Sequence, residues 1–178
     1  MEHNIRNFMR DFQLAYQLKG ISRVYDFVND FFTCDAVYYG TSSTEHCVGK
    51  DALMSLITYD WSYWGLLELD IDNAHINVYG DAAGFVTTGC VRWNIPKEQL
   101  LEKAKADIRE IIDGPYSLKE CTMKINNLTS KVLLESERGD HHILPVRISA
   151  MLCIIDNLWK ISQLVISHPT ANYPDSRL

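Results

Sequence analysis

The sequence predicts an α+β fold in which a curved sheet wraps around helices near the N-terminus. First, apolar side chains recur at helical spacing through much of the first 60 residues, which is typical of amphipathic helices. Second, apolar and polar side chains alternate through much of the rest of the chain, as in antiparallel strands. Third, this alternation changes parity within one extended run, which indicates a β-bulge where the sheet curves sharply.

The first part of the chain is expected to hold three helices and one strand. Ser22 is a suitable N-cap for the second helix, and Leu53, Leu56 and Ile57 form the buried stripe of the third. The predicted helices cover residues 5–16, 21–32 and 50–60, and the predicted strand covers residues 34–41.

The rest of the chain is expected to form an antiparallel meander with one helical interruption. The bulge is expected near Asp72-Asn73, and Gly80-Asp81 and Asp156-Asn157 are turn signals. Strands are predicted over residues 69–78, 85–93, 146–154 and 159–165, and a helix over 96–113. Residues 116–140 have a weak, polar pattern, with a short strand at 131–135 and a loop at 135–142.

Composition indicates a globular, cytoplasmic protein. The 178 residues fit a single domain, and no apolar run approaches the ~20 residues that span a bilayer. A net charge of −6 with scattered basic residues argues against a nucleic-acid surface. Five cysteines without a CxxC pair indicate reduced thiols, and no metal or other cofactor is expected. Cys47 stands beside His46, but adjacency in sequence is weak support for a catalytic pair.

Three stretches carry a resemblance to a known family. The first is the turn Gly40-Thr41 … Glu45 … Val48-Gly49-Lys50, the second is Gly80-Asp81-Ala82-Ala83, and the third is the ending from Trp159 to Arg177 with Ser167-His168-Pro169-Thr170. With these stretches, the chain resembles the SnoaL-like branch of the nuclear transport factor 2-like superfamily. The resemblance implies one cone-shaped domain over residues 1–178, in which residues 94–140 are an atypical insertion.

The resemblance leaves the function open, because members include isomerases, cyclases, dehydratases, sensors and association domains. The enzymes mostly use a desolvated carboxylate as base and a tyrosine or protonated aspartate as hydrogen-bond donor. The Asp and Tyr set of ketosteroid isomerase cannot be placed on this sequence, which weighs against steroid isomerisation.

Candidate site residues follow from this chemistry. Asp60 lies among aromatic residues and is the expected base, with His168 as the alternative and Tyr39 or Tyr16 as donor. Residues expected to contact a ligand are Tyr16, Glu45, Trp61, Trp64, Trp93 and Arg147. Each also has a purely structural explanation: packing for the aromatic residues, capping or ion pairing for Glu45, and a buried pair for Arg147 and His168.

Three hypotheses follow. The preferred one is a small-molecule-binding domain for an apolar or aromatic, possibly acidic, ligand. The second is an isomerase, cyclase or dehydratase that uses acid–base chemistry in the cone. The third is an association or sensory domain without catalysis. A homodimer is expected in all three, because Leu164 and Ile166 lie on one side of the last strand and Ile161 and Val165 on the other.

Overall fold

The computed structural model describes residues 2–41, 45–63, 65–94, 96–137 and 141–167. The chain forms two compact units, Met1–Arg92 with Leu144–Pro169, and Trp93–Ile143 with Thr170–Leu178. The segment predicted to be an insertion, 94–140, falls within the second unit. The helices are α1 (Glu2–Gln17), the 3-10 helix η1 (Ile21–Arg23), α2 (Val24–Phe31), α3 (Lys50–Tyr63), α4 (Lys97–Asp113) and α5 (Leu118–Glu137). The strands are β1 (Phe32–Tyr39), β2 (His46–Val48), β3 (Leu66–Leu69), β4 (His75–Tyr79), β5 (Ala82–Asn94), β6 (His141–Ile155) and β7 (Leu158–Ser167).

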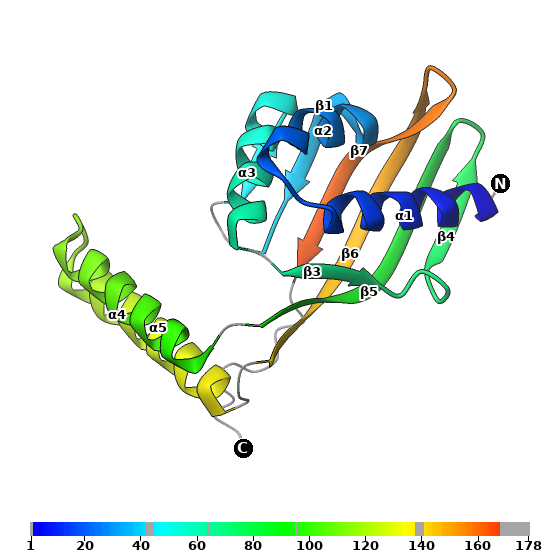
Figure 1. Ribbon diagram of the computed structural model, residues 1–178. Helices are drawn as coiled ribbons and strands as arrows, with labels where there is room; N and C mark the ends of the chain where they lie inside the picture. Colours follow the sequence, from blue (N-terminus) through cyan, green and yellow to red (C-terminus); the bar gives the residue numbers. More distant parts are fainter. Residues whose placement is uncertain (1, 42–44, 64, 95, 138–140, 168–178) are drawn as a thin grey trace. The chain divides into compact units, whose positions relative to one another are not determined.

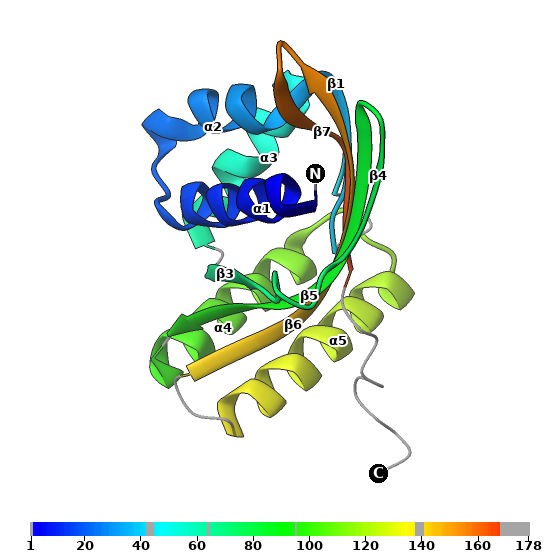
Figure 2. The same ribbon diagram turned by 90° about the vertical axis from the view of Figure 1, so that its right-hand side faces the viewer.

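The strands form one mixed sheet in the order β2-β1-β7-β6-β5-β3, with β4 also paired to β5. The pairing of β1 with β7 is parallel, whereas β1–β2, β3–β5, β4–β5 and β6–β7 are antiparallel. Helices α1, α2 and α3 all lie on one face of this curved sheet (Figures 1 and 2). The α+β prediction, with a sheet curved around N-terminal helices, is therefore confirmed.

Alternation along the strands directs apolar side chains to the core. In β6, Val146, Ile148 and Ala150 are buried, while the side chains between them are exposed. Between the helices and the sheet lies a cluster of aromatic rings whose centroids are 5.1–6.3 Å apart. Its members are Phe12, Tyr16, Phe27, Phe31, Phe32 and Trp61.

Polar side chains attach the helices to the sheet. Lys160 of β7 donates hydrogen bonds to the carbonyl oxygens of Asn29 (2.6 Å) and Asp30 (2.8 Å). This places a cation at the C-terminal end of α2, where carbonyl groups lack helical partners. From α1, Gln17 donates to the carbonyl oxygen of Leu67 at 2.8 Å, and Gln13 accepts from the backbone N–H of Leu69 at 2.6 Å. These bonds fix α1 along β3.

Several predicted elements need correction. The extended run with a bulge at Asp72-Asn73 is instead two strands, β3 and β4, which pair with different parts of β5. Strand β2 was not predicted, and β6 begins at His141, within the predicted loop. The expected strand at 131–135 lies within helix α5. Ser117 and Glu120 form a capping box before this helix, with Ser117 N–H donating to Glu120 Oε2 at 2.9 Å and Glu120 N–H donating to Ser117 Oγ at 3.3 Å.

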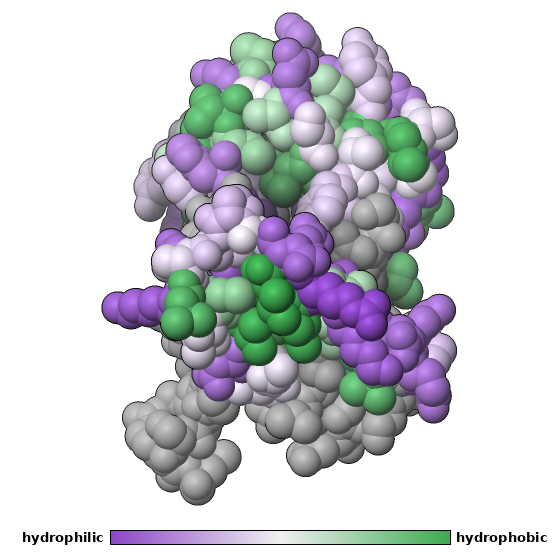
Figure 3. Space-filling view, turned by 90° about the vertical axis from the view of Figure 1, so that its left-hand side faces the viewer, coloured by the Kyte–Doolittle hydropathy of each residue, from purple (hydrophilic) through white to green (hydrophobic). Residues whose placement is uncertain are grey.

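The second unit contains the α4–α5 hairpin. Its surface carries apolar side chains between charged ones: Leu101, Ile112, Leu118 and Met123 are all exposed. Figure 3 shows a face of the molecule on which hydrophobic side chains lie among hydrophilic ones. None of the helices in the described part of the chain is both long and apolar enough to cross a membrane.

Candidate functional site

Asp60 is the most unusual ionisable residue in the described structure. It lies near the C-terminal end of α3 and is only 3% exposed. Its Oδ1 atom has no hydrogen-bond partner among the described residues. Burial, and then the charge of Glu45, raise the pKa of Asp60 to about 7, although Lys19 acts in the opposite direction. A carboxyl group with this pKa can accept or release a proton near neutral pH.

Two side chains from neighbouring strands stand close enough to interact with this carboxyl group. Tyr38 in β1 and Cys47 in β2 are directly paired across the sheet, and Tyr38 is only 3% exposed. Burial, followed by the charge of Asp60, raises the pKa of Tyr38 well above its usual value. The phenol therefore stays protonated and can donate a hydrogen bond at neutral pH. Burial, followed by Asp60, also raises the pKa of Cys47, which opposes a reactive thiolate.

Glu45 fixes the turn between β1 and β2. Its Oε2 atom accepts hydrogen bonds from the backbone N–H of Thr41 at 2.7 Å and from Thr41 Oγ1 at 3.4 Å. Gly40 N–H donates to the carbonyl oxygen of Glu45 at 2.8 Å. A Cβ atom at Gly40 would lie 2.7 Å from Glu45 Cβ, so a larger residue at this position would displace Glu45. The Gly40-Thr41 … Glu45 motif therefore forms this turn. Its Glu45 carboxylate also carries a negative charge that raises the pKa of Asp60.

Helix α1 and the segment after it bring Tyr16 and Lys19 to this region. Lys19 follows α1, and burial lowers its pKa while Asp60 raises it. Tyr16 is 6% exposed, and its ring contacts that of Trp61 edge-on with centroids 5.9 Å apart. Tyr16 also contributes to the raised pKa of Tyr38. Asp60 thus interacts with ionisable groups from the segment after α1, from β1, from β2 and from the β1–β2 turn.

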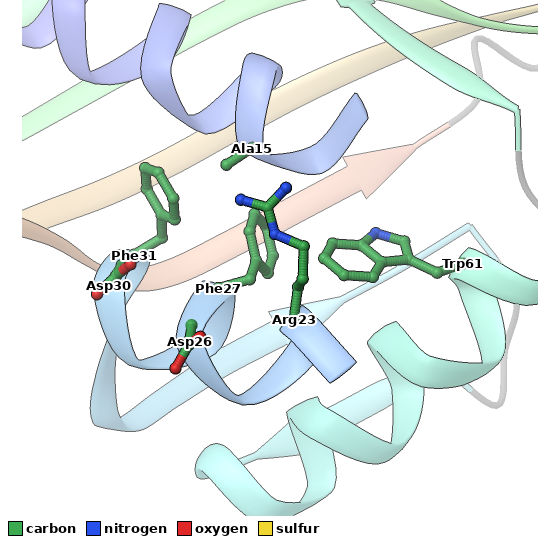
Figure 4. Close-up of a pocket in the computed structure, with 7 residues that line it drawn as sticks. All are labelled: Ala15, Arg23, Asp26, Phe27, Asp30, Phe31 and Trp61. Carbon is green, nitrogen blue, oxygen red and sulfur yellow. The ribbon is translucent and has the colours of Figure 1, made fainter. Parts of the chain in front are cut away.

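A separate cavity of about 250 Å³ lies beside Trp61, between the three helices. Its lining includes Arg23, Phe27 and Trp61 but not Asp60. Trp61 is 8% exposed, and its Nε1 has no acceptor among the described residues. The prediction that Trp61 contacts a ligand stays a prediction. Figure 4 shows the side chains around it.

The other predicted site residues are placed as follows. Tyr39 is 45% exposed and stacks on His46 with ring centroids 4.4 Å apart, whereas its neighbour Tyr38 is buried with Asp60. Arg147 is exposed and pairs across the sheet with Ser167. It alternates with the buried Ile148, so its side chain is not on the helix-covered face. His168 and the side chains of Trp64 and Trp93 lie outside the described residues.

Sequence reasoning missed Tyr38, Lys19 and Cys47 as neighbours of Asp60. Tyr38 could have been recognised from its two-residue spacing to Ala36, a small apolar residue that is also buried. Lys19 and Cys47 carry no such signal, because tertiary packing alone brings them near α3. Among the described residues, no three His, Cys, Asp or Glu side chains are grouped to hold a metal ion.

No protein-family model and no curated protein matches the chain. Many solved structures do match in fold. A provisionally assigned dehydratase of the nuclear transport factor 2-like family from Streptomyces avermitilis has a TM-score of 0.60 and 10% identity, covering 95% of this chain and 96% of its own. A nuclear transport factor 2-like superfamily protein from Salmonella enterica has a TM-score of 0.59 and 12% identity, covering 95% and 91%. A provisionally assigned scytalone dehydratase from Novosphingobium aromaticivorans has a TM-score of 0.58 and 10% identity, covering 94% and 83%.

Identities this low establish the fold alone. These two solved structures match the fold over 95% of the chain. The fold that the sequence motifs predicted is thereby confirmed: the chain has the nuclear transport factor 2-like, cystatin-like α+β fold.

Proposed function

We propose that this protein binds an apolar or aromatic carbonyl compound beside Asp60 and exchanges a proton with it. The observation that carries the proposal is the unpartnered, buried Asp60 Oδ1 next to the protonated phenol of Tyr38. Buried polar atoms are normally hydrogen-bonded, and exceptions require a specific explanation. A ligand that supplies the missing proton or hydrogen bond is such an explanation.

The arrangement suits removal of a proton from a carbon next to a carbonyl group. Ionised Asp60 would take this proton, because a base with a pKa near 7 is effective at neutral pH. Tyr38 would donate a hydrogen bond to the carbonyl oxygen as negative charge develops there. Return of the proton to another carbon gives an isomerisation, whereas loss of a neighbouring hydroxyl group as water gives a dehydration.

The aromatic surroundings favour an apolar ligand skeleton. Tyr16, which influences the pKa of Tyr38, is buried and in edge contact with the buried ring of Trp61. A dry surround strengthens the interactions of Asp60 and Tyr38 with a ligand. Two of the solved structures with this fold are provisionally assigned as dehydratases, and this supports a reaction of the same class here.

Hydrogen–deuterium exchange tests the proposal. A panel of aromatic and alicyclic ketones is incubated with the protein in D₂O, and exchange of the protons next to the carbonyl is followed by NMR. We expect exchange of at least one ketone to rise with pH through about 7 and to fall at least ~100-fold in Asp60→Asn. The matched control is Asp81→Asn, which makes the same chemical change at an exposed turn residue.

Three other outcomes are informative. Equal exchange by the wild type and Asp60→Asn would refute Asp60 as the base. Saturable binding of a ketone without exchange would support a binding domain that does not turn its ligand over. Loss of exchange in Tyr38→Phe with unchanged binding would assign Tyr38 to stabilisation of the developing oxyanion.

A further inference from the structure

The α4–α5 hairpin buries only part of the apolar surface of α4. The two helices lie side by side (Figures 1 and 2), and the Cys121 thiol of α5 donates a hydrogen bond to the carbonyl oxygen of Ile111 in α4 at 3.4 Å. On α4, Ala104 is 7% exposed, and Leu100 and Ile111 are half-buried. These three residues are spaced by four and seven positions, so they form one line along the helix. Helix α5 therefore covers this line of α4.

A second apolar line on α4 is not covered by the part of the hairpin that the structure describes. Leu101, Ile108 and Ile112 are spaced by seven and four positions, so they also lie along one side of the helix. Leu101 is 38% exposed, Ile112 is 59% exposed and Ile108 is half-buried. Single exposed apolar side chains need no explanation, whereas contiguous ones mark interaction sites.

Charged residues follow the exposed apolar line of α4, and their order is self-complementary. Glu98, Glu102, Lys105 and Arg109 are all exposed and are spaced by four, three and four positions, so they form a line of their own. The acidic residues occupy the N-terminal half of this line and the basic residues the C-terminal half. An antiparallel pair of α4 helices therefore brings opposite charges together, whereas a parallel pair brings like charges together.

We propose that the exposed apolar line of α4 binds the same line of a second copy in antiparallel orientation, so that two α4–α5 hairpins form a four-helix bundle. With Leu101 opposite Ile112 of the second copy, Glu102 stands opposite Arg109 of the second copy. The same surface is used by both copies, as in other two-fold symmetric contacts. Bundles of this kind bury the apolar lines that a two-helix hairpin leaves exposed.

The proposed contact is small and reversible. Helix α4 has 17 residues and spans about 25 Å, and it offers three apolar and four charged side chains. A standard interface has roughly 20–30 residues on each side, so association through α4 should depend on protein concentration. The opposite charges fix the orientation of the two helices more than they add affinity.

This contact is separate from the other surfaces and sites considered above. It uses α4 and not the sheet, so it differs from the homodimer expected from the last strand. It also does not depend on the proton transfer proposed for Asp60.

Sedimentation velocity of the full chain over a hundredfold range of concentration measures self-association and its dissociation constant. Glu102→Arg places cations together across the contact and Arg109→Glu places anions together, so each variant should raise the dissociation constant at least ~10-fold. The double variant that joins Glu102→Arg with Arg109→Glu restores opposite charges and should return the constant to within about 3-fold of the wild type. Because these positions are seven residues apart, they are not neighbours within one helix, and the restoration reports on contact between copies.

Ile112→Ser tests the apolar line and should raise the dissociation constant at least ~10-fold. The matched control is Met123→Ser. Met123 is 56% exposed on α5 and lies two positions from Cys121, on the other side of that helix. The constant should be unchanged in this control, and circular dichroism checks that each variant keeps the helical content of the wild type.

Three results would overturn the proposal. The first is the absence of self-association at every concentration. The second is self-association that none of the α4 variants changes, which would assign it to another surface such as the sheet. The third is a double variant that associates as weakly as the single variants, which would mean that Glu102 does not face Arg109 of the second copy. None of these results affects the exchange experiment on Asp60.

Discussion

Replacing Asp60 by asparagine should stabilise the protein above pH 7 and have little effect near pH 4. The pKa of this carboxyl group is raised from 3.8 to about 7 in the folded protein. The folded state therefore holds a proton that the unfolded chain releases over this interval. Stability contributed by that proton is fully present below pH 3.8 and is lost as the pH rises through 7.

The size of the effect follows from the two pKa values. A difference of one pKa unit corresponds to 1.36 kcal/mol, so the interval from 3.8 to about 7 corresponds to about 4 kcal/mol. Asparagine resembles the neutral acid and avoids this loss. In a chain of this size, 1 kcal/mol changes the melting temperature by roughly 2–4 °C, so we expect Asp60→Asn to melt roughly 10 °C higher than the wild type at pH 8.

Calorimetric melting of the wild type and Asp60→Asn from pH 4 to pH 8 measures this difference. Asp81→Asn serves as the control, and its profile should run parallel to that of the wild type. Parallel profiles for Asp60→Asn, or a lower melting temperature than the wild type at pH 8, would refute the assignment of a raised pKa to Asp60. The same experiment also probes the proposed chemistry, because a carboxyl group with a pKa near 7 can both take up and release a proton at neutral pH.

Three further changes test other parts of the structure. Gly89→Ala should destabilise the protein by about 2–3 kcal/mol in urea unfolding, because its Cβ would lie 2.4 Å from the Glu68 carbonyl oxygen. Gly84→Ala, where the new Cβ is 3.6 Å from the nearest backbone atom, should cost little, and equal losses would contradict this. Arg6→Met should lower the free energy of unfolding by about 2 kcal/mol in the same assay, because Arg6 donates hydrogen bonds to the carbonyl oxygens of residues 71, 72 and 74. An unchanged free energy of unfolding would mean that these bonds do not stabilise the β3–β4 turn. Glu45→Gln keeps a hydrogen-bond acceptor but removes a negative charge, so the titration midpoint of Asp60, measured by carboxyl ¹³C NMR, should fall below 7. An unchanged midpoint would exclude Glu45 as a cause of the raised pKa of Asp60.

Much of the fold could be predicted because local signals agree with tertiary packing. The Asp156-Asn157 turn is an example: both residues have positive φ angles, 51° and 62°, which these residue types tolerate in a hairpin. Helix α5 shows the opposite case. Its residues are mostly polar, and those over 118–130 are half-buried or exposed, so hydrophobic periodicity gave little indication of a helix. The capping box at Ser117 was the one usable signal.

The candidate site could be predicted only for residues whose neighbours in the sequence indicate their surroundings in the fold. Asp60 was predicted as a base because it lies between aromatic residues near a helix end, and the structure shows that it is buried. The tyrosine donor was predicted to be Tyr39 or Tyr16; Tyr39 is exposed, whereas its neighbour Tyr38 is buried and interacts with Asp60. Neighbouring residues on a strand face opposite sides of the sheet, so an error of one position exchanges a buried side chain for an exposed one. The register of β1 against β7 shifts between Phe32 and Val37. Because of this irregularity, the sequence alone does not indicate which residues of β1 face the helices.

Glu45 links the fold to the chemistry of Asp60. The sequence motif around it was informative for the turn, and the turn is indeed where its carboxylate is hydrogen-bonded. The negative charge of this carboxylate contributes to the raised pKa of Asp60. A substitution that preserves the turn can therefore still change proton transfer. For this reason, retention of the Gly40-Thr41 … Glu45 turn in a variant is evidence of a preserved fold, whereas the titration of Asp60 is the measurement that reports on the proposed site.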